Sequence, residues 1–468
     1  MTEELSPRQR AEHLTSHAMS IVSSDGQSAV RFLLSATVLD PTYAEAWYNL
    51  GVIEGEVGAL EASCFLYRKA LACDPEHIRA LVNLSFRSHW CGRTEEAEAA
   101  ALRAIEVDFL DYHAWVNLSV IQSVQGRLQE SLDSAKRANG IRDNHETKLC
   151  LAFAYLYLGD FATGLKYHES RFENQVQNLE RLPWPRWAGE DVSEKTVLII
   201  SEQGIGDTLS FMRFVPLVAK RARKVELTVH ENLLRLVSAA MLVYPNVTVR
   251  TITQVYPEAD FWTSFMSLPF PLQLSNEEIR GAEDIFWPPF TCPVDYIRKE
   301  ATLNVGICWA GNPDCAIEKF RRIPLLEFEP LASVPGVQLY SLQIGESYND
   351  IHNSGFSTFI SDLKPMIHDV ADTFGILKKL DLVITAETSI GHMCGALGIP
   401  CWVLCSRVGG DFRIGRNPPS SAVGWYPNHR YFQQTNVAGW TGVMESVREA
   451  LTAAVSDAAL RRSSKESS

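Results

Sequence analysis

The first third of the chain places its apolar residues at the spacing of amphipathic helices, and the pattern repeats every 34 residues. Columns of like residues share that period: Trp47, Leu81 and Trp115; Asn49, Asn83 and Asn117; Gly58, Gly92 and Gly126; and Ala70, Ala104 and Ala138. Each unit predicts two helices joined at the glycine and ended by Asp-Pro, because proline cannot continue a helix. One such pair cannot bury its apolar face alone, so the units are expected to stack into a superhelix.

The pattern changes after a linker rich in Trp and Pro, residues 182–189, in which Trp184 and Trp187 are expected to dock on the following domain. Short apolar runs then alternate with helical stretches, which is typical of parallel, doubly wound sheets. The predicted strands are residues 196–201, 225–229, 247–250 and 261–262 in a first series, and 304–309, 337–342, 382–385 and 400–404 in a second. The two series predict two α/β lobes with a cleft between them. The polar end, residues 456–468, is predicted to be disordered.

Composition narrows the classes of function. The 468 residues carry 43 Lys and Arg against 56 Asp and Glu, a net charge of −13, which argues against nucleic acid or an anionic membrane as partner. We see no apolar run long enough to span a bilayer and no signal peptide, and the ten cysteines are scattered, so we expect a cytoplasmic protein with reduced thiols. Cys401 and Cys405 have no Cys or His pair beside them, so we predict no metal site.

A glycine loop, Glu202-Gln-Gly-Ile-Gly-Asp207, follows the first predicted strand. Gly204 and Gly206 permit a tight turn and close backbone approach where a helix begins, and the free N–H groups there attract an anion. Asp207 is either a reactive carboxylate or an ordinary helix N-cap. Leu209 occupies the place of the third glycine of a dinucleotide fingerprint, which disfavours a nicotinamide-linked oxidoreductase.

A basic loop follows the first strand of the second series. It runs from Trp309-Ala-Gly-Asn312 to Lys319, Arg321 and Arg322. Cations beside a glycine turn suit a diphosphate, which Arg can hold through two parallel hydrogen bonds. A solvated basic loop is an equally good interpretation of these residues.

A third loop, Thr385-Ala-Glu-Thr-Ser-Ile-Gly-His392, joins a predicted strand to a helix. The backbone N–H groups around Thr388 and Ser389 are suited to phosphate, and the Glu387 carboxylate to sugar hydroxyls. His392 lies one turn inside the helix, where a packed residue is the commoner interpretation.

The 34-residue period resembles the tetratricopeptide repeat over about residues 8–178, in roughly five units. Protein O-GlcNAc transferases resemble this chain in carrying such repeats ahead of a sugar-transfer domain, and they use asparagine ladders. The resemblance implies that Asn49, Asn83 and Asn117 line one surface and bind the backbone of an extended peptide. The alternative is that these amides satisfy contacts between the helices.

The three loops resemble the glycosyltransferase family 9 domain, best known from the ADP-heptose:lipopolysaccharide heptosyltransferases. Further matching motifs are Ile323-Pro-Leu325, Ser341-Leu-Gln343, Asp411-Phe-Arg413 and Trp425-Tyr-Pro427. The resemblance implies a GT-B fold of two Rossmann-like lobes, 179–299 on the acceptor side and 300–455 on the nucleotide-sugar side, and inversion without a metal.

The same resemblance implies a role for single residues. Asp207 matches the position of the general base. The donor and phosphate site would comprise Gly204, Gly206, Asn312, Lys319, Arg321, Glu387, Thr388, Ser389 and His392. Two positions depart from the family pattern: Glu387 replaces an aspartate, and Arg321 replaces a common lysine.

We therefore expect a bacterial glycosyltransferase with a nucleotide-diphosphate sugar as co-substrate, ADP-heptose by family analogy, and no bound cofactor. The acceptor would be a protein, such as an adhesin or flagellin, or a lipopolysaccharide-type glycan. The repeats would bind a protein or self-associate. The alternative is a non-catalytic repeat scaffold with a degenerate GT-B domain.

Overall fold

The computed structural model describes residues 5–174, 182–252, 256–283, 285–292, 297, 302–315, 317–408, 410–414, 425–434 and 439–466. The chain divides into two compact units, Met1–Ala154 and Tyr155–Ser468. This division precedes the boundary expected at 178/179, because the last helical segment of the repeats packs within the second unit. Residues 175–181 lie outside the described part of the chain.

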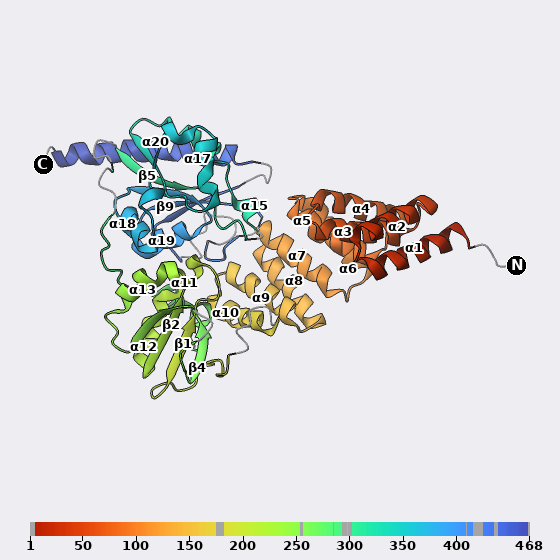
Figure 1. The fold of residues 1–468 in the computed structure, drawn as a ribbon, viewed down its shortest axis with the longest axis horizontal. Helices are drawn as coiled ribbons and strands as arrows, with labels where there is room; N and C mark the ends of the chain where they lie inside the picture. The colour runs from red at the N-terminus through yellow and green to blue at the C-terminus, as the bar shows by residue number, and fades with distance from the viewer. Residues whose placement is uncertain are drawn as a thin grey trace. The chain divides into compact units, whose positions relative to one another are not determined.

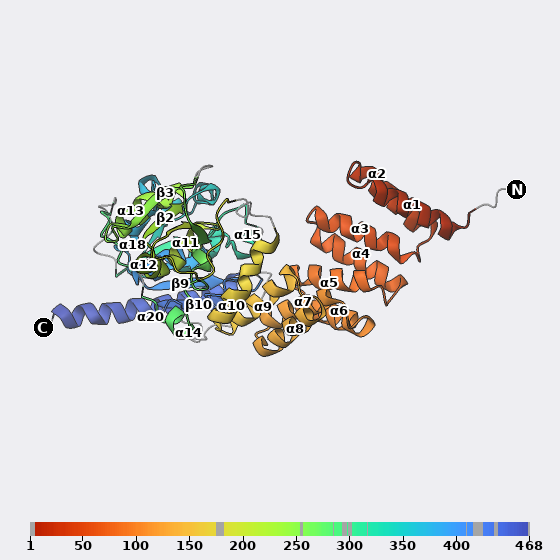
Figure 2. The ribbon, with the colours of Figure 1, turned by 90° about the horizontal axis from the view of Figure 1, so that it is seen from below.

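The first unit is built from successive helix pairs (Figure 2). Its helices are α1 (Pro7–Ile21), α2 (Gly26–Leu39), α3 (Ala44–Glu56), α4 (Leu60–Cys73), α5 (Ile78–Trp90), α6 (Thr94–Val107), α7 (Tyr112–Val124) and α8 (Leu128–Ile141), and α9 (His145–Tyr157) crosses the division. These bounds confirm the predicted pairs, and this all-helical repeat region resembles tetratricopeptide repeats.

The repeated glycines and alanines explain why each pair forms. Gly58, Gly92 and Gly126 end the first helices with φ of +82°, +75° and +77°, a left-handed conformation that favours glycine. Ala70 and Ala104 are fully buried, since a larger side chain would push neighbouring helices apart. The residues that recur every 34 positions therefore take the same structural place in each helix pair.

In the second unit, α10 (Phe161–His168) precedes a four-stranded parallel sheet (Figure 1, green). Its strands are β1 (Thr196–Ile200), β2 (Lys224–Val229), β3 (Val247–Thr251) and β4 (Phe261–Ser264), in the order β3-β2-β1-β4. The helices are α11 (Ile205–Phe211), α12 (Val215–Arg221), α13 (Leu234–Met241) and α14 (Asn276–Arg280). All four strands predicted in the first series are confirmed.

The Trp and Pro linker docks on this sheet as expected. Trp187 is buried, and its backbone N–H donates to the carbonyl of Trp262 at 2.7 Å. Trp184 packs against a cluster that includes Leu198 and Ile200 of β1. The linker is therefore part of the first lobe.

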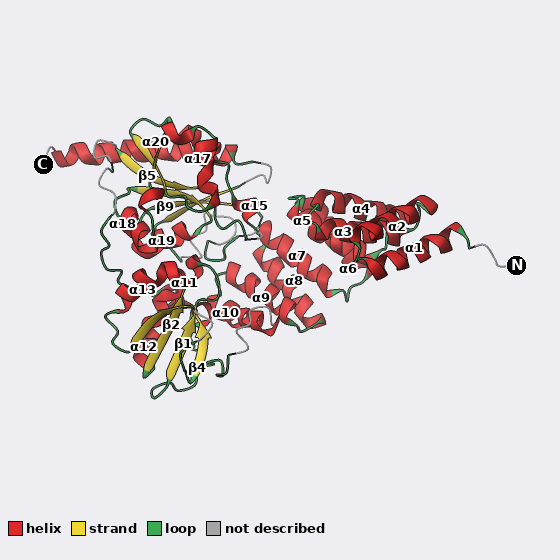
Figure 3. Ribbon diagram, viewed as in Figure 1, coloured by secondary structure: helices red, strands yellow, loops and turns green. Residues whose placement is uncertain are grey.

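A six-stranded parallel sheet follows (Figure 3, yellow). Its strands are β5 (Leu303–Cys308), β6 (Val337–Ser341), β7 (Ile360–Asp362), β8 (Leu382–Ala386), β9 (Cys401–Cys405) and β10 (His429–Gln433), in the order β10-β9-β8-β5-β6-β7. Its helices are α15 (Glu318–Arg321), α16 (Glu329–Ala332), α17 (Asp350–Asn353), α18 (Val370–Leu377), α19 (Ser389–Leu397) and α20 (Thr441–Glu466). The predicted α/β class is confirmed, and β7 and β10 are strands that the sequence pattern did not predict.

Helices cover both faces of the second sheet. Leu382 and Ile384 of β8 share a core with Met444 and Val447 of α20. On the other face, a Cβ built on Gly391 of α19 would lie 3.9 Å from the methyl of Thr385. Alternate residues of β8 thus face opposite helical layers, as expected for a strand buried on both sides.

The predicted disordered tail is wrong for the residues through Glu466, because α20 continues to that residue. Ala-Ala-Val-Ser-Asp-Ala-Ala-Leu, residues 453–460, is rich in strong helix formers, and this propensity outweighs the polar end. Residues 467–468 lie outside the described part.

Each sheet reverses its winding at one place. In the first sheet the chain moves from β1 outward to β2 and β3, and then returns to the other side of β1 with β4. In the second sheet it moves from β5 to β6 and β7, and then returns to β8 beside β5. Ligands of open α/β sheets bind outside the carboxyl ends of the strands at such switch points. The three predicted loops follow β1, β5 and β8, the strands that flank these two points.

Candidate functional site

The loops of the two switch points meet through α11 and α19, which face each other between the sheets (Figure 1). A Cβ built on Gly206 would lie 2.4 Å from Cδ2 of His392. Glycine is therefore required at 206 because the two helices approach so closely. His392 packs against the first lobe at this contact.

Asp207 connects the two lobes. Its Oδ2 accepts a hydrogen bond from the backbone N–H of Gly204 at 3.1 Å. Gly204 is the N-cap of α11 and Asp207 its third residue, so the N-cap role considered for Asp207 from the sequence is wrong. Its Oδ1 accepts from Nη2 of Arg413, in the second lobe, at 2.8 Å. The side chain remains 21% exposed. The Asp207 carboxylate thus faces the second lobe and binds a side chain there in addition to the backbone of its own loop.

Arg413 is buried between two carboxylates. Its Nε and Nη2 donate to Asp411 at 2.7 and 2.6 Å, and Nη1 donates to Ser210. Burial opposes the charge of the guanidinium, but Asp411 and Asp207 outweigh it and raise the pKa of Arg413. Burial would likewise raise the pKa of Asp411, but Arg413 and His392 hold it well below its ordinary value. The site therefore keeps a buried cation and its partner anion charged.

His392 joins this cluster from α19. Its Nε2 lies 3.2 Å from Oδ2 of Asp411, and its Nδ1 lies 3.0 Å from the hydroxyl of Tyr426. Burial, aided by the positive charge of Arg413, lowers the pKa of His392. A neutral ring matches the packed helix residue considered from the sequence, and its bonds tie the start of α19 to the Asp411 loop.

Glu387 holds the loop that follows β9. Its Oε2 accepts from the backbone N–H of Ser406 at 2.9 Å, and its Oε1 accepts from that of Asp411 at 3.4 Å. Beside it, Thr388 caps α19 by accepting from the N–H of Ile390 at 3.3 Å, and Ser389 is the first helical residue. The two residues therefore stand at the helix start that the sequence predicted.

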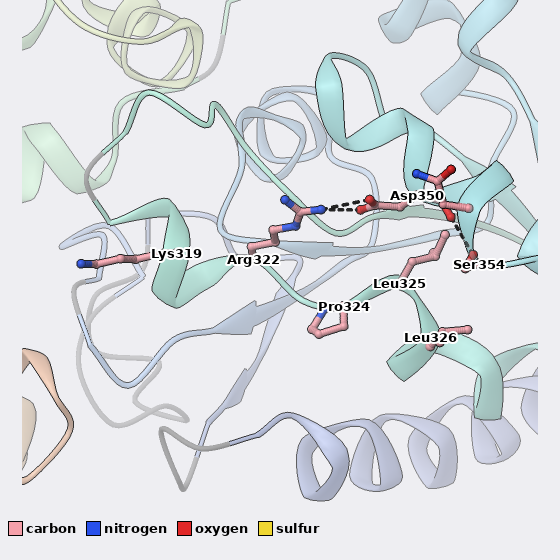
Figure 4. A pocket seen from close by; sticks show the side chains of 8 residues that line it. Lys319, Arg322, Pro324, Leu325, Leu326, Asp350 and Ser354 are labelled. Atoms are coloured by element: carbon pink, nitrogen blue, oxygen red, sulfur yellow. Dashed lines mark hydrogen bonds and ion pairs between the residues drawn. The ribbon is translucent and has the colours of Figure 1, made fainter. Parts of the chain in front are cut away.

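The arginines of the basic loop bind different carboxylates. Arg321 pairs with Glu318 at 2.6 Å, and Arg322 pairs with Asp350 at 2.8 Å. A surface hollow of about 570 Å³ lies beside them, lined by Lys319, Arg322, Pro324, Leu325, Leu326, Asp350, Asn353 and Ser354. In Figure 4, Arg322 reaches toward Asp350 while the Lys319 side chain extends to the opposite side.

Asn312 is exposed, and its side-chain oxygen accepts from the N–H of Asp314 at 3.1 Å, which closes a local turn. Its loop follows β5, next to the β8 loop, and Thr388 Oγ1 lies 3.8 Å from Sγ of Cys308 at the end of β5. Asn312 and Thr388 thus stand on the two loops of one switch point. Asp207 and His392 belong to one cluster through Arg413 and Asp411, whereas no described contact joins Lys319 or Arg321 to them.

The asparagines of the repeats donate hydrogen bonds inside the array. Nδ2 of Asn49 donates to the carbonyl of Glu45 at 2.8 Å, and that of Asn83 to the hydroxyl of Tyr67 at 3.3 Å. Nδ2 of Asn117 donates to the carbonyl of Val82 at 3.0 Å. The bonds of Asn83 and Asn117 join different helices and match the helix-to-helix alternative, whereas the bond of Asn49 lies within α3. Peptide binding by the ladder stays a prediction.

Sequence reasoning did not assign a role to Asp411, Arg413 or Tyr426, which complete the cluster around Asp207. The available signal was the pair of opposite charges in Asp411-Phe-Arg413, on either side of an aromatic residue. Their partners lie in the other lobe, and Arg413 is 206 residues from Asp207.

The chain thus combines a helical repeat region that resembles tetratricopeptide repeats with an α/β region of two parallel sheets. No protein-family model matches it. Protein FlbA of Caulobacter vibrioides is 22% identical over 462 residues, which cover 90% of this chain and 69% of FlbA. Tetratricopeptide repeat protein 8 of Caenorhabditis elegans is 38% identical over 64 residues, 14% of this chain and 13% of that protein.

Solved structures of repeat proteins also match the chain. MamA of Desulfovibrio magneticus is 16% identical with a TM-score of 0.32, over 37% of this chain and 96% of its own. A tetratricopeptide repeat protein of Thermus thermophilus, TTC0263, is 17% identical with a TM-score of 0.31, over 36% of this chain and 94% of its own. Within the described residues, no helix has the length and apolarity that crossing a bilayer requires.

Proposed function

We propose that the chain is a glycosyltransferase that moves a sugar from a nucleotide-diphosphate donor to a hydroxyl of a protein or glycan. The observation that supports this most is that Asp207, at the first switch point, binds Arg413 on the loop that follows β9, the strand next to β8 of the second switch point. A ligand that binds at both switch points would contact loops of both lobes, as a donor and an acceptor must during transfer. The resemblance to glycosyltransferase family 9 supplies the class of reaction and the GT-B arrangement.

In this proposal Asp207 is the general base. A carboxylate has about four acceptor positions on its two oxygens, and the two bonds to Gly204 and Arg413 leave positions for an acceptor hydroxyl. Asp207 takes the hydroxyl proton as that oxygen attacks the anomeric carbon. The bond from this carbon to the diphosphate then breaks, and the nucleoside diphosphate leaves with inversion of the sugar.

The diphosphate would lie at the start of α19, beside Thr388 and Ser389, where backbone N–H groups offset the charge that develops on the leaving group. Arg321 would contribute only after it leaves Glu318, with which it pairs at 2.6 Å. ADP-heptose is the donor we propose to test first.

Two measurements test the proposal. Calorimetry with ADP-heptose and other nucleotide sugars should show one of them binding the full chain. Mass spectrometry of total protein and glycan, from cells with and without the chain, should show a product whose mass differs by one sugar. If no nucleotide sugar binds and no such product is found, the proposal is wrong.

A specific observation favours a second candidate, a non-catalytic scaffold. Both oxygens of Glu387 accept from the chain's own backbone at Ser406 and Asp411, whereas the family resemblance assigns this position to the donor. Under this candidate the repeats bind a partner protein and the α/β region has lost its chemistry. Absence of binding of every nucleotide and nucleotide sugar in the same calorimetry would support it.

A further inference from the structure

The segment that follows the division of the chain contacts loops of both lobes. On the second lobe, the hydroxyl of Tyr157 donates to the carbonyl of Gly410 at 3.1 Å. Phe161, fully buried at the start of α10 (Phe161–His168), packs edge-on against Trp425 with ring centroids 5.2 Å apart. Gly410 begins the short stretch that carries Asp411 and Arg413. This segment therefore contacts the loop that carries Arg413.

The same segment reaches the first lobe through a buried ion pair. Arg171, in the 3₁₀ helix Glu169–Asn174, donates from Nη2 to Oε1 of Glu202 at 2.6 Å and from Nε to Oε2 at 3.2 Å. The side chains of Arg171 and Glu202 are only 6% and 1% exposed. Arg171 also donates to Glu169 and to Ser264 and Ser267 at the end of β4. Its guanidinium thus joins the loops on both sides of the first switch point.

Glu202 begins the glycine loop that ends at Asp207. The two loops that present Asp207 and Arg413 to each other are therefore both fixed to one short segment, at Arg171 and at Tyr157. Burying charges is costly unless each is well paired, so a buried pair placed at a loop, rather than among core apolar residues, indicates a positional role.

From this geometry we infer that Arg171 and Tyr157 are positioning residues that set the placement of Asp207 against Arg413. The inference extends the proposed function and rests on it for the catalytic consequence. It also implies that the segment from Tyr157 to Arg171 contributes to the function of the α/β unit, so a fragment that begins at residue 179 lacks the contacts that hold both loops.

The test compares variants of the full chain by hydrogen exchange and by turnover of ADP-heptose, or of whichever nucleotide sugar the wild type consumes. Tyr157→Phe removes one hydroxyl and keeps the buried ring. Its matched control is Tyr348→Phe, which removes a bond of 2.8 Å to Asp362, far in sequence from either loop. Arg171→Lys keeps the charge but loses the two-point grip on Glu202.

We expect exchange to rise about fivefold in residues 410–414 of Tyr157→Phe, as the loss of one hydrogen bond implies. Exchange should rise more in residues 202–207 of Arg171→Lys, and neither loop should change in Tyr348→Phe. In both positioning variants kcat should fall while KM stays within twofold, because neither side chain belongs to the proposed donor site.

The two proposals fail in different ways. If the loops of both variants exchange as in the wild type, the inference is wrong, whatever the activity. If hydrogen exchange rises but kcat is unchanged, the two residues hold the loops as inferred, but their role in catalysis is refuted. If exchange rises and the wild type turns over no nucleotide sugar, the loops are held as inferred and the proposed function is the part that fails. Should Arg171→Lys fail to fold, Tyr157→Phe decides alone.

Discussion

The repeat unit and the α/β unit place their charges in different ways. In the repeats, ion pairs link neighbouring units at the surface: Arg79 binds Glu45, 34 residues earlier, at 2.7 Å and is 58% exposed. In the α/β unit, Arg413 is buried and binds Asp207 across the lobes, 206 residues away. The ion pairs of the repeats are therefore local and exposed, and each contributes little to stability. The α/β unit instead contains a few buried charges whose loss is expected to cost more.

The largest expected effect is that of Arg413→Met, which leaves Asp411 and Asp207 without their cation. Removing one partner of a buried pair costs about 3–5 kcal/mol of unfolding free energy. Urea unfolding with pulse-labelled hydrogen exchange would measure this in strands β1 to β10 separately from the repeats.

The matched control is Arg235→Met. Arg235 also joins the lobes, with Asp369 and Asp372, but it is 52% exposed. Its loss should cost under about 1 kcal/mol, and the same holds for Arg79→Met in the repeats. Equal losses in Arg413→Met and Arg235→Met would contradict the difference between buried and exposed pairs.

Gly206→Ala should have the next largest effect. Its Cβ would lie 2.4 Å from the ring of His392, which is itself held by Asp411 and Tyr426 and cannot move freely. We expect a loss of about 3 kcal/mol, the upper part of the range for overpacked sites. Gly204→Ala is the control in the same loop, because its Cβ would make an ordinary contact of 3.4 Å with Asp207. A folded, fully stable Gly206→Ala protein would show that the lobes can separate at this point.

The two units should also respond differently to acid. Burial lowers the pKa of His429 to about 3, and burial lowers the pKa of His168 as well. A histidine with a lowered pKa stabilises the fold above about pH 6.5 and loses this contribution as the pH falls, so His429 alone should cost the α/β unit about 2 kcal/mol between pH 7 and 5.

In the repeats, the hydrogen bond to Glu146 raises the pKa of His113. Its contribution is complete below about pH 6.5 and is lost as the pH rises, so His113 should not weaken the repeats in acid. Urea midpoints of the two units at pH 7 and 5 would check both signs. The assignment would be contradicted if the α/β unit were no less stable at pH 5 than at pH 7. It would also be contradicted if the α/β unit of a His429→Gln variant lost as much stability between pH 7 and 5 as the wild type.

Gly140→Ala in α8 should have the smallest effect, and of opposite sign to Gly206→Ala. A Cβ there would meet nothing within 4 Å. Alanine restricts the unfolded chain more than glycine does, so the variant should gain about 0.4–1 kcal/mol. A rise in the thermal midpoint of the repeats would confirm it, and a fall would show that this helix surface is covered.

The same contrast explains what the sequence could predict. Helices α3 to α8 follow from residues that recur at one period, and eight of the ten described strands follow from short apolar runs. Strand β10, His429–Gln433, escaped because it is an edge strand with charged and polar residues, and β7 has only three residues. A local sequence pattern predicts a strand only when the strand is buried, because burial requires a run of apolar residues.

The site was predictable in part for the same reason. Asp207 and the loops after β5 and β8 stand out because glycines and strand ends are local signals. The partner of Asp207 and the binding of Glu387 to the backbone of Ser406 are set by tertiary contacts, which the order of residues along the chain does not show. Residue types alone also could not tell that Arg321 and Arg322 are paired with Glu318 and Asp350.

The release of nucleoside diphosphate from a nucleotide sugar, compared between the wild-type chain and Asp207→Asn, tests the central claim most directly. Asparagine keeps the size of the side chain and an oxygen that can accept from Gly204, but it cannot take a proton. The account predicts that the variant still binds the donor and that its kcat falls by about 10² to 10⁴. Equal turnover by the two proteins would show that carboxylate 207 is not the base.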